Sequence, residues 1–160
     1  MKIAVVSDSH GNLYSLDRAL SKLGEFDMIV HLGDHFNDVI KVNEKYKKPI
    51  EYVCGNNDYG KDVKYEKIIE VNGKRLLLVH GHRYDVYYNV LKLYLKALEE
   101  RVDIVLFGHT HVQMIEREGD VLFINPGSTS RPRDGMPGAA LLEIKEDGEV
   151  EVNTIRFTIE

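Results

Sequence analysis

The sequence predicts an α/β (α+β) fold in which two mixed β-sheets pack face to face and helices cover their outer surfaces. Three observations carry this prediction. In the first third of the chain, short apolar runs rich in β-branched residues alternate with helical patterns, which is typical of parallel strands joined by helices. The remainder reads mainly as hairpins with one more helix, which favours a second sheet packed on the first. With 160 residues, 43% of them hydrophobic, the chain can bury one core, so we expect a single domain over residues 1–160.

The first third of the chain contains three predicted strands and two predicted helices. The strands are the apolar runs at residues 3–6, 28–32 and 50–54. Asn12 can cap the first helix. Four leucines in that helix share one face and are expected to be core residues: Leu13, Leu16, Leu20 and Leu23. The second helix is expected over residues 37–46, and Pro49 ends it.

Hairpin signals dominate the rest of the chain, with Asn72-Gly73 as the strongest of them. The hairpin strands are predicted at residues 65–71 and 75–79, 112–116 and 121–124, and 139–144 and 150–159. A buried strand is expected over residues 102–106. Asp85 is expected to cap a helix that runs through Glu100. Its core-facing residues are predicted to be Val86, Val90, Leu93, Ala97 and Leu98.

Composition limits the possible classes of function. The chain carries 21 Lys and Arg against 26 Asp and Glu, a net charge of −5 with the signs interspersed. This balance argues against stable nucleic-acid binding. The single cysteine, Cys54, excludes an internal disulfide and is expected to be a buried small apolar residue. The first apolar run is too short for a signal peptide or a membrane span. We therefore expect a cytoplasmic protein that does not associate with membranes.

The segment that follows the strand at 102–106 carries two histidines, His109 and His111. In an extended chain, residues i and i+2 point to the same side, so both rings could face one point in space. Neutral imidazole is a common metal ligand near neutral pH. The alternative is an exposed loop that holds two unrelated histidines, and other parts of the chain have to decide between these interpretations.

Four other predicted strands end in similar polar residues, at the edge of an α/β sheet where sites are usually built. Together the strand ends carry seven ligand-type groups: Asp8, His10, Asp34, Asn56, His80, His109 and His111. This is enough for two metal ions if one carboxylate bridges them, and Asp34 suits that role because it is an anion with two usable oxygens. Nitrogen and oxygen ligands without a thiolate favour Mn²⁺, Fe²⁺, Ni²⁺, Co²⁺ or Zn²⁺ over Ca²⁺ or Mg²⁺.

Several other polar residues allow two interpretations. His31 lies inside an apolar run and is expected to be a core histidine or a partner of a ligand rather than a ligand. Arg131 and Arg133 follow a buried strand and could hold a substrate phosphate, or they could be solvated surface residues beside Pro132. The tyrosines between Tyr84 and Tyr94 are expected to serve packing or a partner surface, which makes a homo-oligomer possible.

The ordered motifs D-x-H, G-D, G-N-x-D, H-G-H and G-H-T-H resemble those of the calcineurin-like metallophosphoesterase superfamily, over residues 8–128. The small size and the sequence Gly55-Asn56-Asn57-Asp58 resemble the compact YfcE-type phosphodiesterases. The resemblance implies a four-layer fold of two central sheets with flanking helices. It also implies a dinuclear metal centre that hydrolyses phosphoesters, with a hydroxide between the two ions.

The resemblance further assigns roles to individual residues. It implies that one ion is held by Asp8, His10 and His111, and the other by Asn56, His80 and His109. Asp34 would bridge the two divalent transition-metal ions, of which Mn²⁺ is the first expectation and Ni²⁺, Fe²⁺, Co²⁺ or Zn²⁺ are the others. Asp58 is expected to orient His10 or a neighbouring ligand.

The chain departs from the common family pattern at one position. Many members have a histidine directly after the asparagine ligand, where it acts on the leaving group, and this chain has Asn57 there. Asn57 can donate a hydrogen bond to a phosphoryl oxygen but cannot supply a proton at neutral pH. We therefore expect a preference for good leaving groups, as in activated diesters, or a proton from another residue. His82 is the first candidate for that role, and a hydrogen bond to a ligand is its alternative.

Three functions are compatible with these residues. The first is a two-metal phosphodiesterase acting on a small soluble phosphoester, and it is favoured because all seven ligand positions are present. The second is a protein-binding scaffold that has lost its chemistry, as in the superfamily's retromer subunit. The third is a phosphomonoesterase, which the absence of the leaving-group histidine disfavours. Metal-dependent turnover of chromogenic monoesters and diesters separates the three.

Overall fold

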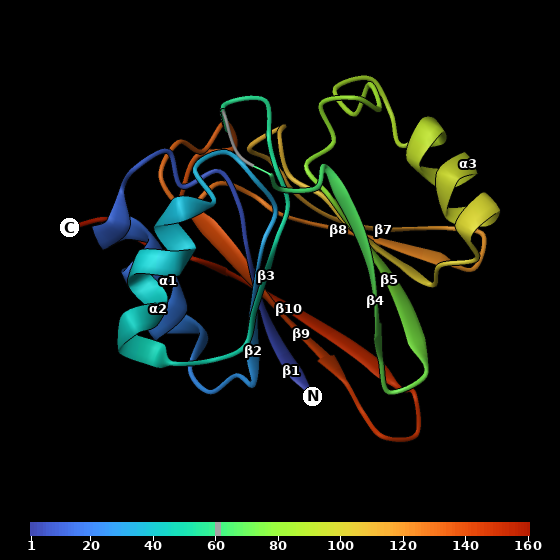
Figure 1. Ribbon diagram of the computed structural model, residues 1–160, viewed down its shortest axis with the longest axis horizontal. Coiled ribbons are helices and arrows are strands. Elements are labelled where there is room, and N and C mark those ends of the chain that lie inside the picture. The colour runs from blue at the N-terminus through green and yellow to red at the C-terminus, as the bar shows by residue number, and fades with distance from the viewer. Residues whose placement is uncertain (60–61) are drawn as a thin grey trace.

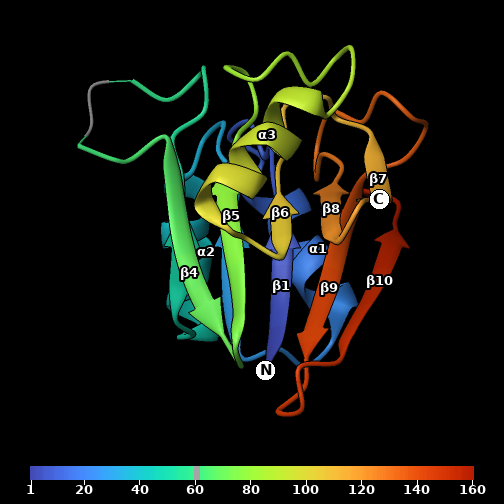
Figure 2. The same ribbon diagram turned by 90° about the vertical axis from the view of Figure 1, so that its right-hand side faces the viewer.

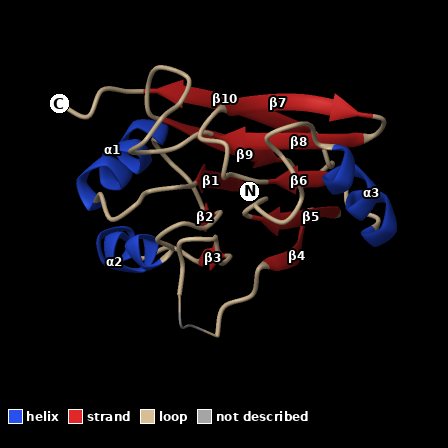
Figure 3. Cartoon of the chain, turned by 90° about the horizontal axis from the view of Figure 1, so that it is seen from above, coloured by secondary structure: helices blue, strands red, loops and turns tan. Residues whose placement is uncertain are grey.

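The computed structural model describes residues 1–59 and 62–160. Two five-stranded sheets lie face to face, with two helices on one outer side and one on the other (Figures 1 and 3). This is the predicted four-layer α/β arrangement. The first sheet contains β1 (Lys2–Val6), β2 (Met28–His31), β3 (Ile50–Tyr52), β9 (Gly138–Ile144) and β10 (Val150–Arg156). The second contains β4 (Glu66–Val71), β5 (Lys74–Val79), β6 (Ile104–Leu106), β7 (Gln113–Glu118) and β8 (Val121–Pro126).

Both sheets are mixed, and their parallel strands point their carboxyl ends at the same end of the molecule (Figure 2). In the first sheet, ordered β10-β9-β1-β2-β3, the strands β1, β2 and β3 are parallel and β9 and β10 pair antiparallel. In the second, ordered β4-β5-β6-β8-β7, the strands β5, β6 and β8 are parallel. The loops that carry the predicted ligands therefore meet at one edge of the two sheets.

Alternation along the strands explains why the layers form. On β1, Ile3 and Val5 face the second sheet, while Ala4 and Val6 face the helices. Aliphatic side chains of both sheets fill the space between them, and Leu78 and Leu106 are examples from the second sheet. Each side chain buried in this way contributes about 1.5–3 kcal/mol. The apolar core thus fixes the spacing of the two sheets, and with it the spacing of the loops at their edge.

The helices cover the outer faces of the sheets. The helices α1 (Leu13–Leu23) and α2 (Asn37–Tyr46) pack on the first sheet, and α3 (Leu91–Glu100) packs on the second. The predicted cap is confirmed, since the side chain of Asn12 accepts a hydrogen bond from the backbone N–H of Ser15 at 2.9 Å. In the described residues, no helix is long and apolar enough to cross a membrane.

Three details of the predicted elements are wrong. The last helix begins at Leu91 rather than at Asp85, and the preceding residues form turns in which Tyr88 N–H donates to Asp85 C=O at 3.0 Å. Asp85 has φ 51°, so it does not cap a helix. The reason is local, because Asn89 Oδ1 accepts from the N–H of Leu91 two residues later and competes with a helical start. Two leucines predicted to be core residues are also exposed, Leu98 of α3 at 53% and Leu13 of α1 at 37%.

Two predicted strands also end earlier than expected. The third strand stops at Tyr52, because the N–H of Cys54 turns away from β2 and donates to Lys64 C=O at 2.9 Å. The last strand stops at Arg156 rather than near Ile159. Cys54 is buried, as predicted, and burial raises the pKa of its thiol. The other strands match their predicted positions to within about two residues.

Candidate metal centre

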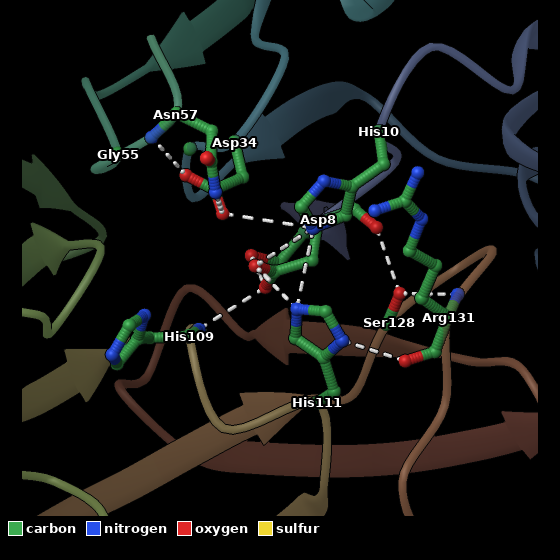
Figure 4. A network of polar contacts seen from close by, with 12 residues as sticks. Asp8, His10, Asp34, Gly55, Asn57, His109, His111, Ser128 and Arg131 are labelled. Atoms are coloured by element: carbon green, nitrogen blue, oxygen red, sulfur yellow. Dashed lines mark hydrogen bonds and ion pairs between the residues drawn. The ribbon is translucent and has the colours of Figure 1, made fainter.

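The seven predicted ligands converge at the edge where the parallel strands end, and Figure 4 labels five of them, Asp8, His10, Asp34, His109 and His111. Asp8 and His10 follow β1, Asp34 follows β2, and Asn56 follows β3. His80 follows β5, and both His109 and His111 follow β6. Each of the two sheets therefore contributes ligands.

One group of side chains forms around Asp8, which is completely buried. Its Oδ1 lies 3.1 Å from His111 Nε2, and the Nε2 atoms of His10 and His111 are 3.3 Å apart. His10 Nε2 lies 3.6 Å from Asp34 Oδ2. Ligand atoms of Asp8, His10, Asp34 and His111 all lie within 4.8 Å of one another. This spacing is suitable for one metal ion held by oxygen and nitrogen.

A second group forms around His80, which is also completely buried. Its Nε2 lies 3.0 Å from Asn56 Oδ1 and 3.2 Å from His109 Nδ1. It lies 3.4 Å from Asp34 Oδ1. The two carboxylate oxygens of Asp34 therefore face different groups, Oδ2 toward His10 and Oδ1 toward His80. This is the arrangement that a bridging carboxylate requires.

The tautomers of two histidines indicate that the site fits cations. His80 Nδ1 lies 2.7 Å from Leu32 C=O, and His111 Nδ1 lies 2.6 Å from Arg131 C=O. A carbonyl oxygen only accepts, so each Nδ1 carries a proton and each Nε2 is left to face the site. These Nε2 atoms lie beside oxygens of Asn56, Asp34 and Asp8, which are acceptors. A metal ion placed among these atoms would be coordinated by the ring nitrogens and the oxygens together.

Burial and charge shift the pKa values of these side chains in a direction that helps metal binding. Burial lowers the pKa of His10 and lowers that of His109 to about 4, so both rings are neutral at pH 7. At Asp8, burial opposes ionisation, but the hydrogen bond with His111 and the charges of His80 and His111 keep its pKa below the usual value. At His111, burial is outweighed by the Asp8 carboxylate, which raises the pKa. Protons therefore compete with a metal mainly at His111.

The backbone geometry of the ligand loops differs from the sequence expectation. Asp8, His10, Asp34, His109 and His111 all have positive φ, between 48° and 68°. The chain is thus not extended at these residues, and the rings of His109 and His111 do not meet at one point. His109 faces His80 and His111 faces Asp8, which is the division between two groups that the family resemblance implies. A positive φ is uncommon for residues other than glycine and is found where function constrains the chain.

Gly108 occupies a position where no side chain fits. A Cβ on this residue would lie 2.7 Å from Asp8 Oδ2 and closer still to Ser7 Oγ, both of which belong to completely buried residues. Gly108→Ala is therefore expected to displace the Asp8 carboxylate and to weaken metal affinity roughly 10- to 100-fold, the usual effect of disturbing a ligand's support. Isothermal titration calorimetry with Mn²⁺ measures this.

Gly24→Ala is the matched control for Gly108→Ala, because a Cβ at Gly24 meets nothing within 4 Å. Gly24 has φ +81°, so this substitution strains the backbone without reaching the ligands. Its metal affinity should equal that of the unmodified protein. Equal affinity in Gly108→Ala would show that Asp8 is not a ligand, or that the loop yields without cost.

Asp58 and Asn57 hold the carboxylate of Asp34 and its loop in place. The carboxylate of Asp58 accepts hydrogen bonds from four backbone N–H groups, those of Asp34, His35, Phe36 and Gly55. It thereby orients the Asp34 loop, while no described contact joins it to His10. Asn57 donates to Asp34 twice, from its backbone N–H to Oδ1 at 2.9 Å and from its side-chain amide to Oδ2 at 2.7 Å. The amide that we expected to reach a phosphoryl oxygen is thus engaged with Asp34.

His31 lies behind the ligands and is fully buried, as the sequence predicts. Its Nδ1 accepts from the N–H of Gly33, and its Nε2 pairs with Ser9 Oγ at 2.9 Å. Burial lowers its pKa to about 4. The folded protein therefore keeps His31 neutral, whereas the unfolded chain takes up a proton near pH 6.5.

Acid is consequently expected to destabilise the metal-free protein through His31. Because the unfolded state binds the extra proton, this contribution to stability is complete above pH 6.5 and is lost as the pH falls toward 4. Two and a half pKa units correspond to about 3 kcal/mol. Nuclear magnetic resonance of the ring provides the check, since the His31 signals should not titrate between pH 8 and 5. A ring that titrates near pH 6.5 would contradict the assignment.

A cavity of about 320 Å³ opens over the ligands. Besides ligands, its lining includes Asn57, Arg131, Arg133 and Tyr87. Both arginines are exposed, and their positions are compatible with phosphate contacts. His82 does not belong to the lining; its ring centre lies 5.4 Å from that of His80, and among the described residues its buried Nδ1 has no hydrogen-bond partner. The sequence did not indicate that Tyr87 lines this cavity. A helix is predicted from Asp85, whereas the structure has turns there, and these turns place the Tyr87 side chain at the cavity.

Comparisons with known proteins agree with this geometry. The family model of the calcineurin-like phosphoesterase superfamily domain matches residues 1–147. The chain is 30% identical over 159 residues to the probable metallophosphoesterase YsnB of Bacillus subtilis, and the alignment covers 98% of this chain and 90% of YsnB. It is 28% identical over 165 residues to phosphodiesterase YfcE of Escherichia coli, and the alignment covers 87% of this chain and 85% of YfcE.

A solved structure shows the same fold. Vps29 of Entamoeba histolytica, crystallised in complex with Zn²⁺, superposes with a TM-score of 0.77 over 99% of this chain and 100% of that chain, at 22% identity. At this identity the likeness concerns the fold alone. The family model over residues 1–147 and the identity with these relatives show that the chain belongs to the calcineurin-like phosphoesterase superfamily, as a small homologue of the YfcE type.

Proposed function

We propose that this protein is a metal-dependent phosphodiesterase that hydrolyses a small soluble phosphoester at a centre of two divalent ions. The observation that carries the proposal is the position of Asp34 between two groups of ligands, with one oxygen facing each. Nitrogen and oxygen donors favour transition metals, with Mn²⁺ as our first choice. The single buried cysteine supports a reducing compartment such as the cytoplasm.

The residues of the chain divide the work of binding and positioning. Asp8, His10 and His111 would hold one ion, Asn56, His80 and His109 the other, and Asp34 both. When bound, two such ions supply Lewis acidity and an activated water for phosphoester hydrolysis. Arg131 and Arg133 line the cavity and can donate charge-assisted hydrogen bonds to phosphoryl oxygens.

The supply of a proton to the leaving group limits the substrates. The side-chain amide of Asn57 donates to Asp34 and has no titratable proton at neutral pH. His82 as a proton donor stays a proposal, and its position outside the cavity lining gives it no support. We therefore propose diesters with good leaving groups as the substrates hydrolysed fastest.

The proposal is tested by metal removal and replacement. Protein treated with a chelator should not hydrolyse bis(p-nitrophenyl) phosphate, and added Mn²⁺ should restore turnover. With the same metal, p-nitrophenyl phosphate should be hydrolysed more slowly. Faster hydrolysis of the monoester would favour a phosphomonoesterase. Absence of turnover with Mn²⁺, Ni²⁺, Fe²⁺, Co²⁺ and Zn²⁺ would favour the alternative, a protein-binding scaffold that has lost its chemistry.

Asn57→His offers a more specific prediction about leaving groups. The imidazole would restore a titratable group where many relatives have one, while the backbone N–H at this position still donates to Asp34. We expect hydrolysis of diesters with alkyl leaving groups to rise about 100-fold, the lower end of the range for general acid catalysis. The rate with p-nitrophenyl leaving groups should change little. Equal changes for both classes would contradict a leaving-group role at this position.

A further inference from the structure

Tyr87 is a large aromatic residue at the rim of the metal cavity, and its side chain is held in one orientation. Its ring centre lies 4.8 Å from that of His109, with the two planes at 62°. Its hydroxyl donates to His109 C=O at 3.2 Å and accepts from Arg133 Nη1 at 2.5 Å. These contacts fix the ring on one side, yet Tyr87 remains 54% exposed.

Tyr87 lines the same cavity as the ligands and the two arginines. The Arg133 guanidinium lies 5.5 Å from the ring centre, so a cation and an aromatic surface are presented together. Fixed aromatic rings beside cationic groups bind planar rings by stacking, with little loss of side-chain freedom. Neither the metal ligands nor the fold requires an exposed ring here.

We propose that Tyr87 and Arg133 form a subsite for an aromatic ester group, so that the substrate class is a phosphoester of a nucleoside or a similar aryl group. The phosphate would lie toward the metal ligands and the planar ring on Tyr87. The claim that such a compound is hydrolysed rests on the proposed function. The claim that the site prefers to bind it does not, because binding can be measured without turnover.

A different explanation is that Tyr87 only supports His109. That role uses the hydroxyl and the ring edge, and its loss would change the affinity for every phosphate compound alike. A subsite changes the affinity only for compounds that carry a planar ring. Comparing the affinities for two compounds with the same phosphate and different ester groups therefore separates the explanations.

The experiment compares thymidine 5′-monophosphate with ethyl phosphate on the Mn²⁺-loaded protein by calorimetry. The unmodified protein should bind the nucleotide about tenfold more tightly, within the range measured for base–aromatic stacking. Tyr87→Leu should bring the ratio of the two affinities close to one. Tyr87→Phe, which keeps the ring and loses the hydroxyl, should keep the ratio. Tyr88→Leu is the matched control, because Tyr88 is 87% exposed and does not line the cavity.

Each result decides the inference. A ratio near one in the unmodified protein, or a ratio that survives Tyr87→Leu, would overturn it. Hydrolysis of bis(p-nitrophenyl) phosphate, followed in parallel, reports on the proposed function separately. A protein without turnover that still loses its nucleotide preference in Tyr87→Leu would refute the phosphodiesterase and retain the subsite.

An independent observation concerns the outer surface of α3. Leu91, Leu95 and Leu98 are 56%, 57% and 53% exposed. Their spacing of four and three residues places them on one stripe of the helix, apart from the buried Leu93 and Ala97. Three neighbouring leucines left half exposed form a continuous apolar stripe rather than scattered surface residues.

The charges beside this stripe suit a second copy of the same helix. Lys92 and Glu99 lie on the same flank of the leucines, seven residues apart. If two copies pair antiparallel about a twofold axis through Leu95, each Lys92, which also pairs with Asp85 of its own chain, faces the partner's Glu99. A parallel pair would bring opposite flanks together, so Lys92 and Glu99 would not meet. We infer that α3 associates with α3 of a second copy in the antiparallel arrangement, as a weak homodimer, because one short helix offers a small interface.

Charge reversal tests this arrangement in solution by sedimentation velocity at micromolar to millimolar concentration. The unmodified protein should dimerise, and Leu95→Glu should make it monomeric. Lys92→Glu or Glu99→Lys alone should weaken the dimer about tenfold, and the double substitution should restore it. Lys41→Glu, on the exposed surface of α2, is the control for added charge. A monomer throughout the concentration range, or a double substitution that fails to restore association, would overturn the inference.

Discussion

Asp34→Asn is expected to lower the hydrolysis of bis(p-nitrophenyl) phosphate by about 10³-fold, because it removes a charge whose two oxygens face the two ligand groups. Two-metal centres stabilise the charge of the transition state by several kcal/mol, and each 1.36 kcal/mol is a factor of ten in rate. The substitution also disturbs hydrogen bonding. Both oxygens of Asp34 accept from Asn57, so one end of the new amide would place a donor against a donor.

Metal content measured by mass spectrometry completes the test of Asp34. We expect fewer than two bound ions per chain in Asp34→Asn and two in the unmodified protein. Asp17→Asn is the control, since Asp17 lies on α1 in an exposed pair with Lys45. If Asp34→Asn keeps both ions and full activity, the carboxylate does not bridge a dinuclear centre and the proposed function loses its main support.

Asp58→Asn is expected to destabilise the protein by about 3 kcal/mol, although Asp58 touches no ion. Oδ2 of Asp58 accepts from the N–H groups of Asp34 and Gly55, both at 2.8 Å, and Oδ1 accepts from His35 at 2.8 Å and Phe36 at 3.2 Å. An asparagine side chain has a single acceptor oxygen, so two of the four N–H groups would face an NH₂ group. The N–H groups of Asp34, Phe36 and Gly55 are part-buried, and an unsatisfied donor shielded from water costs about 1–3 kcal/mol.

Urea unfolding in the presence of a chelator measures this loss without a contribution from metal. Asp17→Asn again serves as control and should change the unfolding free energy by less than about 1 kcal/mol, as exposed ion pairs do. Metal affinity should fall as well in Asp58→Asn, because the loop that carries Asp34 would lose its fixed orientation. Unchanged stability would mean that the four hydrogen bonds can be replaced by water.

Much of the fold and of the ligand set could be predicted because the relevant signals are local. Apolar β-branched runs mark the buried parallel strands, and the residues directly after them must gather at one edge of the sheets. Asp8, Asp34 and His80 can therefore be grouped from the sequence alone. Likewise Asn72-Gly73 marks the hairpin of β4 and β5, since few residue pairs fit that turn.

Other features depend on contacts between distant segments and leave no local signal. The backbone at His109 and His111 has positive φ because packing against Ser7 and Asp8 holds it there, and nothing in G-H-T-H indicates this. The turns before α3 arise from competing hydrogen bonds, so the sequence pattern places Tyr87 on a helix. The partners of Asp58 are backbone groups of a loop more than twenty residues away, and no pattern of residue types encodes them.

Each ligand group contains residues from both sheets, and this affects how long the folded protein survives. Asp8 follows a strand of the first sheet and its partner His111 follows a strand of the second, 103 residues later. An ion between them would act as a removable cross-link that resists separation of the two halves. At a free concentration 100 times its dissociation constant, a ligand of the folded state adds about 2.7 kcal/mol of stability. The supply of metal would then govern how long the chain survives heat and proteases, in addition to whether it can turn over substrate.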